Sequence, residues 1–539
     1  MPRKTKFIVV TGGVLSGLGK GITTASIGHL LGDKLRIIPI KCDGYLNTDP
    51  GTMNPVEHGE VFVLDDGGEV DMDFGHYERF IGITCKFEWN LTMGKVYQAI
   101  LDRERRGDFL GKTVQLIPHV TDEIKSRFKN IAEDEKADIC LIEIGGTVGD
   151  MENELYLEAV RQLAQELGKQ NIFFVHLTYI PIPKNVHEQK SKPTQQSVKL
   201  LNERGIFPDV IIGRSEKQLD SSIKAKIAGF CNVSTEAVIS GVDVDTVYEV
   251  PLRYDEEGLT EIVHKNLGIY SPPKISKWRN LVKKIKEPSR EVSIAICGKY
   301  TKLQDSYASI IEALIHAGAF NDTRVKIKWI ETTRIESGKT TAADSLEGVD
   351  GVIVPGGFGS RGIEGKIEII RHCREMDVPF LGICYGMQLA VVEFARNVCG
   401  IETAGTAESI GNSDKRSIPV ICFLPGQGKI DRKGGTMRLG GQDISLKIGS
   451  KAEGLYSKPK IRERFRHRYE VNPEFVEQLE KAGLVFSGTT PDGGIMQVLE
   501  IPDHPYFIGT QYHPELVSRL EEPEPLFREL VRVALKMGK

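Results

Sequence analysis

The chain has 539 residues, of which 40% are hydrophobic and 27% are charged, an ordinary composition for a folded, water-exposed protein. Its formal net charge is −4, from 70 basic and 74 acidic residues, which excludes a strong overall attraction to nucleic acid or to acidic membranes. The nine cysteines are scattered and form no C-x-x-C pair, which argues against disulfides and against a zinc site. Neither a signal peptide nor an apolar run near 18 residues is seen. We therefore expect a cytoplasmic protein.

The length exceeds what one hydrophobic core supports, so we expect two domains. A Pro-Pro pair at 272–273 and a basic, Pro-containing stretch at 277–290 interrupt the pattern before a new apolar strand at 291–297. We therefore expect an N-terminal domain at 1–271, a linker at 272–290 and a C-terminal domain at 291–539. Apolar strands alternate with amphipathic helices in both parts, which predicts an α/β fold with parallel sheets.

The N-terminal part opens with an apolar strand at 6–11 and a glycine-rich loop at 12–21. Such a loop between a strand and a helix presents backbone N–H groups to phosphate oxygens, and Lys20 faces the same oxygens. The loop departs from the strict Walker pattern, because five residues separate Gly13 from Gly19 and Gly21 stands where a Ser or Thr ligand of Mg²⁺ is usual. We therefore expect any metal ligand to be a carboxylate from elsewhere in the chain.

Two acidic residues are candidate metal ligands. Glu143 ends an apolar strand at 139–143 in the manner of a Walker B-like strand, and Asp73 lies in a dense polar stretch at 71–79. Oxygen ligands beside phosphates suit Mg²⁺. A further polar stretch at 190–196, which we expect to be extended, resembles a second anion site. For each of these segments the alternative is an ordinary solvated surface.

The most informative residue of the C-terminal part is Cys384. It follows an apolar strand at 379–383 and precedes a helix expected to begin near Met387. Gly382 and Gly386 flank it as G-x-C-x-G, the thiol counterpart of a nucleophile elbow, where the strained backbone needs small neighbours. A thiolate at a helix N-terminus is stabilised by the helix dipole.

A base and an orienting acid follow 129 positions downstream, in the stretch QYHPE at 511–515. His513 is the expected base, and Glu515 is placed to orient its imidazole. A strand and glycine turn at 352–359 offers backbone N–H groups, Gly357 best, to hold an oxyanion beside the N–H of Tyr385. Cys, His and Glu in this order resemble class I glutamine amidotransferases, which hydrolyse glutamine to glutamate and ammonia.

Ordered motifs along the whole chain resemble the CTP synthase family: GGVLSGLGKG at 12–21, DPGTMNP at 49–55, HGEVFV at 58–63, GHYERF at 75–80, EIGGTVGD at 143–150 and KPTQ at 192–195. Together with the glutaminase they run from about residue 6 to residue 515 without a large insertion. The resemblance implies a dethiobiotin synthetase-like P-loop domain with a parallel sheet, followed by a class I glutamine amidotransferase α/β domain. It also implies a homotetramer whose UTP site is built across subunits.

The activity implied by the resemblance is ATP-dependent amination of UTP to CTP in pyrimidine nucleotide biosynthesis, with Mg²⁺ and with glutamine as the nitrogen source. Because the uracil 4-oxygen is a poor leaving group, ATP first phosphorylates it, and ammonia channelled from the glutaminase then displaces phosphate. GTP activates the enzyme and CTP inhibits it.

The resemblance also implies the binding residues. ATP is held by Ser16, Gly17, Leu18, Gly19, Lys20, Gly21, Ile22, Lys41 and Asp73, and Mg²⁺ by Asp73 and Glu143. UTP or CTP is held by Ser16, Asp150, Met151, Glu152, Lys190, Ser191, Lys192, Pro193, Thr194, Gln195 and Lys226. Glutamine is held by Gly357, Tyr385, Gly386, Met387, Gln388, Glu408 and Arg468, with Cys384, His513 and Glu515 as the catalytic residues.

Three details qualify the resemblance. Tyr385 stands where many family members carry Leu, but only its backbone N–H is needed. The loop at 434–440 resembles the family's lid. The arginine-rich stretch at 462–469 is not interpreted as a nucleic-acid surface, because the acidic overall balance leaves no wide basic face, and Arg468 instead pairs with the α-carboxylate of glutamine.

Two alternatives stay open. Another P-loop amidoligase, such as a cobyrinic acid a,c-diamide synthase, would aminate phosphorylated carboxylates, but the GHYERF and KPTQ segments are not expected there. A structural or regulatory protein that has lost catalysis is the other, and the intact Cys384, His513, Glu515 and Lys20 argue against it.

Overall fold

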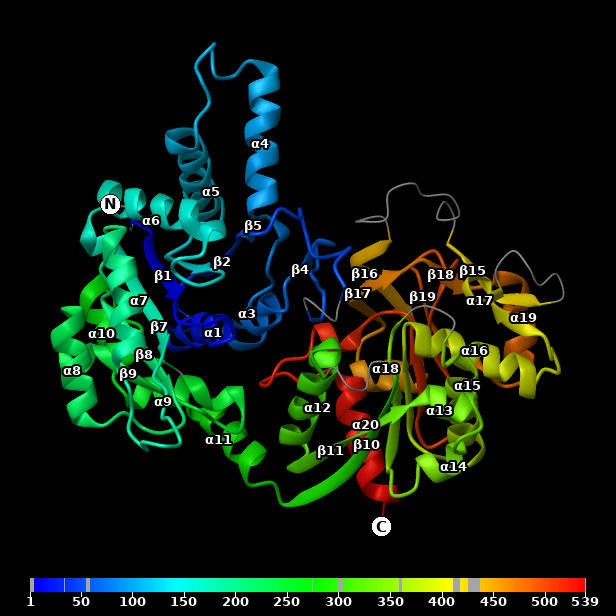
Figure 1. The fold of residues 1–539 in the computed structure, drawn as a ribbon. Helices are drawn as coiled ribbons and strands as arrows, with labels where there is room; N and C mark the ends of the chain where they lie inside the picture. The colour runs from blue at the N-terminus through cyan, green and yellow to red at the C-terminus, as the bar shows by residue number, and fades with distance from the viewer. Residues whose placement is uncertain are drawn as a thin grey trace. The chain divides into compact units, whose positions relative to one another are not determined.

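The computed structural model describes residues 4–32, 34–54, 59–273, 275–298, 304–357, 361–410, 417–424 and 437–538 (Figure 1). The chain divides into two compact units. The first comprises Met1–Pro50 and Asp73–Val282, and the second comprises Gly51–Met72 and Lys283–Lys539. The sequence-based boundaries assigned residues 51–72 to the N-terminal domain, whereas in the structure their contacts group them with the second unit.

The first unit is built on a seven-stranded sheet in the order β5-β2-β6-β1-β7-β8-β9, in which every neighbouring pair is parallel. The strands read as continuous apolar runs because helices bury both faces of the sheet, as for β6, whose residues are all buried. The strands are β1 Lys6–Gly12, β2 Ile37–Asp43, β5 Asn90–Thr92, β6 Ile139–Ile144, β7 Ile172–Tyr179, β8 Val210–Ser215 and β9 Val238–Val242.

Helices connect these parallel strands, and α4 and α5 extend side by side away from the sheet (Figure 1). They are α1 Lys20–Leu30, α3 Asp73–Ile81, α4 Met93–Arg106, α5 Thr121–Asp134, α6 Glu154–Leu167, α7 Lys192–Glu203, α8 Ser221–Cys231, α9 Val250–Glu256, α10 Leu259–Leu267 and α11 Ile275–Lys286. Most of the predicted linker at 272–290 is thus helix α11.

The expectation of an extended segment at 190–196 is wrong, because α7 begins at Lys192. Pro193 lies in the first turn of this helix, where the missing N–H costs nothing and the fixed φ favours the helical conformation. The proline therefore marks a helix start and not an extended chain.

The second unit has a nine-stranded sheet in the order β11-β10-β12-β13-β21-β20-β19-β16-β17. Pairing is parallel from β11 to β21 and antiparallel from β21 to β17, so the predicted parallel sheet holds for only one half. The strands are β10 Arg290–Gly298, β11 Thr323–Glu331, β12 Gly351–Val354, β13 Phe380–Ile383, β16 Arg438–Leu446, β17 Lys460–His467, β19 Val485–Thr489, β20 Met496–Glu500 and β21 Phe507–Thr510.

Alternate residues of the central strands enter two separate cores. On β12, Val352 and Val354 pack on the side of α15 and α16, while Ile353 packs on the side of α12 and α20. The helices of this unit are α12 Ala308–Phe320, α13 Thr332–Glu336, α14 Ala342–Ser345, α15 Ile363–Glu375, α16 Tyr385–Asn397, α17 Ala407–Ile410, α18 Lys451–Tyr456, α19 Pro473–Lys481 and α20 Pro525–Met537.

Two small sheets complete the second unit. One contains β14 Ala404–Thr406, β15 Ile418–Phe423 and β18 Tyr469–Val471. The other is a hairpin of β3 Phe62–Val63 and β4 Glu69–Val70, which are antiparallel. Within the described part of the chain, no helix is long and apolar enough to cross a membrane.

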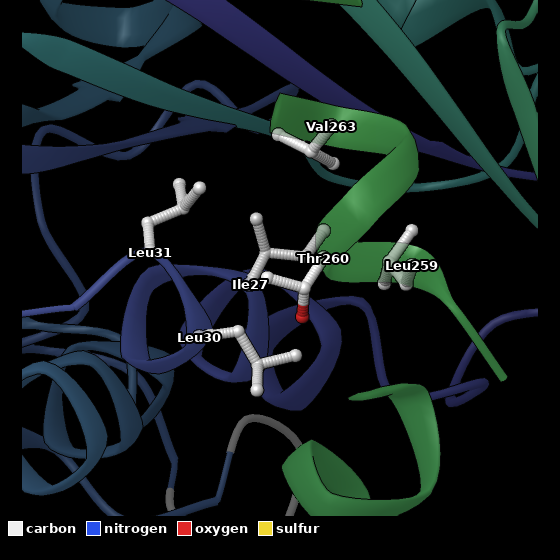
Figure 2. Close-up of a pocket in the computed structure, with 6 residues that line it drawn as sticks. All are labelled: Ile27, Leu30, Leu31, Leu259, Thr260 and Val263. Atoms are coloured by element: carbon white, nitrogen blue, oxygen red, sulfur yellow. The ribbon is translucent and has the colours of Figure 1, made fainter. Parts of the chain in front are cut away.

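A small apolar pocket lies between α1 and α10 in the first unit (Figure 2). Its volume is about 10 Å³, which is at the lower limit for one water molecule. The pocket is therefore a packing gap in the core and is far too small for a nucleotide. Its lining is Ile27, Leu30, Leu31, Leu259, Thr260 and Val263.

Trp278 anchors α11 to the first unit, and its removal should destabilise that unit. Trp278 is 1% exposed, its ring centroid lies 5.3 Å from that of Phe80 in a tilted arrangement, and its Nε1–H donates to the carbonyl of Tyr248 at 2.7 Å. Trp278→Ala should lower the free energy of unfolding by about 3–5 kcal/mol, measured by urea denaturation. Tyr270→Ala, at a ring 82% exposed, should change it by about 0.5 kcal/mol or less. Similar values for the two variants would contradict the anchoring role.

Candidate active sites

Cys384 occupies a sharp turn between β13 and α16. Its φ of 50° and ψ of −98° are strained for a residue with a side chain, as expected for a nucleophile elbow. The helix begins at Tyr385, two residues earlier than predicted, so the sulfur lies at its N-terminal end. A Cβ at Gly386 would overlap the Val354 carbonyl, and one at Gly382 would lie 2.9 Å from the Gly386 backbone. The flanking glycines are therefore required by close packing of the backbone.

His513 and Glu515 lie beside this elbow. His513 donates Nδ1–H to Glu515 Oε1 at 2.7 Å, and a Cβ at Gly356 would lie 2.9 Å from the imidazole and 3.6 Å from Cys384 Cβ. Burial alone lowers the pKa of His513, but the Glu515 carboxylate and then the Cys384 sulfur outweigh it and raise the pKa to about 10. Its Nε2 is buried and, within the described chain, has no hydrogen-bond partner. The site therefore holds an imidazolium beside a sulfur, the arrangement that activates a thiolate nucleophile.

Gln511 is a site residue to which the sequence analysis gave no role. It is fully buried and donates its amide Nε2–H to Cys384 Sγ at 3.5 Å. Its Oε1 accepts from Gln388 Nε2 at 3.1 Å, and Gln388 also donates to the Tyr469 carbonyl at 3.0 Å. The signal in the sequence was its position two residues before His513, in the same short QYHPE stretch.

The other residues expected to bind glutamine lie in different surroundings. Tyr385 is buried, and this burial is the largest cause that raises the pKa of its hydroxyl. The charge of Glu408 on α17 is the second cause and acts in the same direction. Arg468 is half-buried and follows β17. Gly357 is exposed in the turn after β12. The Met387 side chain is fully buried, 3.1 Å from the position of a Cβ at Gly509, and so belongs to the core.

Parts of two predicted loops lie outside the described residues. These are positions 358–359 of the glycine turn after β12 and positions 434–436 of the loop that resembles a lid. The same is true of positions 55 and 58, which belong to two of the motifs in the first half of the chain.

The glycine-rich loop of the first unit connects β1 to α1. Gly17 and Gly19 have φ of 76° and 87°, values that suit glycine, and α1 begins at Lys20. Lys20 donates Nζ–H to the Gly146 carbonyl at 2.8 Å, and burial lowers its pKa against the opposing charge of Glu143. Ser16 and Gly17 are exposed, Gly19 and Lys20 are partly exposed, and the Leu18 side chain packs into the core.

Gly21 and Asp73 are directly adjacent. A Cβ at Gly21 would overlap the Asp73 carboxylate, so Asp73 fills the space that a Ser or Thr side chain takes in a strict Walker loop. Lys41 contacts Asp73 and donates to Glu143 Oε1 at 2.8 Å, while Tyr77 donates to the other oxygen of Glu143. The structure thus brings together three of the four charged residues expected beside the phosphates, Lys41, Asp73 and Glu143.

These carboxylates fit a magnesium ion that also binds a substrate. Burial raises the pKa of Glu143 and that of Asp43, the latter to about 6, whereas for Asp73 the charge of Lys41 outweighs burial and the pKa is lowered. No group of three or more acidic, His or Cys residues in the described chain is arranged to hold a metal alone. Mg²⁺ bound by one or two carboxylates, waters and phosphates needs no such group.

The residues expected to hold UTP or CTP are distributed over the glycine-rich loop, the segment at 150–152, the segment that enters α7, and α8. Asp150 accepts the Thr147 backbone N–H at 2.7 Å, and Met151 and Glu152 are exposed beside it. Lys190 pairs with Glu188 at 2.8 Å. At the start of α7, Ser191 and Thr194 are buried and Pro193 is half-buried. Gln195 donates to Ser191 Oγ at 3.1 Å. Lys192 on α7 and Lys226 on α8 are exposed. Of the two exposed lysines, Lys192 lies at the N-terminus of α7, where backbone N–H groups favour anions, whereas Lys226 lies in the middle of α8.

A buried histidine, to which no sequence motif pointed, connects β1 to α7. His176 contacts Thr11 Oγ1 through Nδ1 and Ser197 Oγ through Nε2, both at 2.8 Å. Burial lowers its pKa to about 3, so the ring is neutral. A Cβ at Gly13 would overlap Ser197 Oγ, which explains this glycine.

The chain resembles known proteins over almost its whole length. The family model for the CTP synthase N-terminus matches residues 6–269, and the model for class-I glutamine amidotransferase matches residues 302–533. CTP synthases of Borreliella burgdorferi and Thermococcus gammatolerans are 53% and 54% identical to it, covering 99% and 98% of this chain and 100% and 98% of theirs. A solved glutaminase domain of Trypanosoma brucei CTPS with bound acivicin is 32% identical, with 46% of this chain and 94% of that chain covered and a TM-score of 0.42.

Gln511→Glu should slow alkylation of Cys384 by iodoacetamide at pH 7 by about tenfold or more. The carboxylate replaces an N–H donor by an acceptor with negative charge, and a hydrogen bond to a charged group contributes about 1.5–3 kcal/mol. The modified Cys384 peptide would be quantified by mass spectrometry. Gln478→Glu, at an exposed position of α19, should leave the rate unchanged. Equal rates for wild type and Gln511→Glu would remove Gln511 from the site.

Proposed function

Because this chain belongs to the CTP synthase family, we propose that its glutamine-dependent synthesis of CTP from UTP uses ATP and Mg²⁺, is activated by GTP and is inhibited by CTP. The observation that supports this best is the presence in one chain of two sites. One is a strained cysteine beside an imidazolium, and the other is a phosphate-binding loop beside buried carboxylates. We further propose a homotetramer in the cytoplasm, with UTP bound across subunits.

The glutaminase releases ammonia in two steps. The Cys384 thiolate attacks the amide carbon of glutamine, and the N–H groups of Gly357 and Tyr385 hold the oxyanion. The His513 imidazolium gives its proton to the departing ammonia, which leaves a thioester. Neutral His513 then takes a proton from water, the hydroxide attacks the thioester, and glutamate leaves as the thiolate is restored. Glu515 keeps the imidazole oriented throughout.

The synthetase converts a poor leaving group into a good one. Lys20 and the N–H groups of the glycine-rich loop bind the ATP phosphates and stabilise the charge that develops during transfer. The γ-phosphoryl group moves to the 4-oxygen of UTP with release of ADP, and ammonia then attacks C4 and phosphate leaves, giving CTP. Asp73 and Glu143 would hold Mg²⁺, which neutralises phosphate charge when bound. Lys41, between the two carboxylates, is the further ATP ligand.

Nucleotide specificity is assigned to the turns and helix ends described above. Ser16, residues 150–152, residues 190–195 and Lys226 bind UTP as substrate or CTP as inhibitor. Tyr385, Gly386, Met387, Gln388, Glu408 and Arg468 complete the glutamine site. Channelling of ammonia to the synthetase without release to solvent would keep the nucleophile neutral, since free ammonia is mostly ammonium at pH 7. By function, we assign the synthetase to residues 1–271 and the glutaminase to residues 291–539, joined by a linker, although the contacts of residues 51–72 group them with the second unit.

Cys384→Ala should abolish glutamine-dependent CTP formation, by about 1000-fold or more, and leave CTP formation from ammonium salt largely intact. The thiolate is needed only to release ammonia, which the added salt replaces. The rate would be followed by the absorbance change from UTP to CTP with ATP and Mg²⁺ present. Equal loss with both nitrogen sources would show that Cys384 has a structural role.

Gly21→Ala should suppress CTP formation with both nitrogen sources, because its Cβ displaces the Asp73 carboxylate. Asp73→Asn should have the same effect, while glutamine still acylates Cys384. Gly454→Ala serves as the matched control, since a Cβ there meets nothing within 4 Å. Near-normal synthesis in Gly21→Ala and in Asp73→Asn would require other ligands for the phosphates and the metal.

A further inference from the structure

Three arginines of β17 bind one short hairpin. Arg462, Arg464 and Arg466 occupy alternate positions and therefore share a face of the strand. Each contacts the β3–β4 hairpin, residues 62–70. Asp65 and Glu69 of this hairpin each lie 397 positions before the arginine that they bind. The hairpin belongs to the first half of the sequence, but it is part of the second compact unit.

The contacts between the hairpin and β17 are specific. Arg462 donates Nε–H and Nη2–H to the two oxygens of Asp65, each at 3.0 Å. Arg464 donates to the Val63 carbonyl at 3.1 Å. Arg466 donates Nε–H to Glu69 Oε1 at 2.9 Å. Two carboxylates and one carbonyl thus fix three consecutive side chains on this face of the strand.

Burial distinguishes the contacts of Glu69 and Arg464 from ordinary surface ion pairs, whereas Arg462 and Asp65 form a more exposed pair. The Glu69 side chain is 2% exposed and Arg464 is 3% exposed. The Gly441 N–H donates to the Asp65 carbonyl at 2.8 Å, and a Cβ at Gly440 would lie 2.5 Å from Gly67 N. The hairpin is therefore packed against β16 as well as β17. Removal of one partner from a buried pair is far more costly than from an exposed one.

The backbone of the same strand contacts the catalytic residues. The Arg464 carbonyl accepts the His513 backbone N–H at 2.8 Å, and the Arg466 carbonyl lies 3.6 Å from Cys384 Sγ. The arginine side chains therefore bind the hairpin while their own carbonyls hold the nucleophile and the base. A shift of this strand moves both catalytic groups.

We propose that the β3–β4 hairpin positions the glutamine-hydrolysing centre, with Glu69 and Asp65 acting through Arg466 and Arg462 on β17. Neither residue touches glutamine or the reacting atoms, so both are positioning residues. The inference rests on the proposed roles of Cys384 and His513. A misplacement of about 1 Å in a catalytic group costs roughly 100-fold in rate, so loosening β17 affects turnover far more than binding.

The test is Glu69→Leu, which removes both carboxylate oxygens at nearly constant volume. The turnover number for glutamine hydrolysis should fall about 10- to 100-fold, with KM for glutamine within about twofold. Alkylation of Cys384 by iodoacetamide, measured without any substrate, should slow in parallel. CTP formation from ammonium salt should stay within about twofold. Glu69→Gln should recover part of the rate, because its amide oxygen still accepts from Arg466.

Asp443→Ala is the matched control. It removes the other carboxylate partner of Arg462, at 3.2 Å, but Asp443 is exposed and lies on β16 and not on the hairpin. This variant should leave hydrolysis and alkylation unchanged. Asp65→Ala provides a second test at a more exposed position, should Glu69→Leu fail to fold, and its rates should fall in the same direction.

The outcomes separate the inference from the proposed function. Unchanged hydrolysis and alkylation in Glu69→Leu, or in Asp65→Ala where only that variant folds, would overturn the positioning role. An equal fall in ammonium-dependent synthesis would also overturn it, because the effect would then be general instability. If the wild-type protein did not hydrolyse glutamine while Glu69→Leu still slowed alkylation of Cys384, the proposed function would fail and the positioning role would stand.

Discussion

The strained backbone of Cys384 is the constraint on which the second unit depends. A residue with a side chain at this φ and ψ costs about 1–3 kcal/mol, so the surrounding structure must hold it there. Two glycines allow β13, α16 and β12 to approach closely, and the start of α16 faces the sulfur. Gln511 and His513, from the segment that follows β21, and the Arg466 carbonyl of β17 then surround the sulfur. The strands that carry or precede these groups all belong to the one nine-stranded sheet.

The first unit uses the same physical device for different chemistry. In the glutaminase, Gly386 has no Cβ and the Val354 carbonyl packs in its place. In the glycine-rich loop, Gly21 has no Cβ and the Asp73 carboxylate packs in its place. Only three residues separate Asp73 from Glu69 of the β3–β4 hairpin. The segment that supports the glutaminase strand β17 therefore continues along the chain into the carboxylate beside the phosphate-binding loop. This covalent continuity gives the two chemistries of the family a shared structural element.

Local signals in the sequence were enough for much of the fold. Apolar strands alternating with amphipathic helices predicted the α/β class, and both the class and the family are confirmed. The errors were local as well. The stretch at 190–196 was expected to be extended although Pro193 lies in the first turn of α7. The linker interpretation overlooked α11, whose amphipathic pattern lies in a strongly basic stretch. The antiparallel half of the second sheet was missed because short strands do not reveal their pairing direction.

The sequence by itself determined which chemical groups are present and their local setting: a cysteine in an elbow, the His513–Glu515 pair and Lys20 in a phosphate-binding loop. Each signal spans a few residues, because local geometry requires particular neighbours. Only the tertiary structure decided which distant groups meet. Gln511 reaches a sulfur 127 positions away, and Glu69 reaches Arg466 over 397 positions. Such partners leave no mark in sequence spacing, since the sheet order, and not the distance along the chain, brings them together.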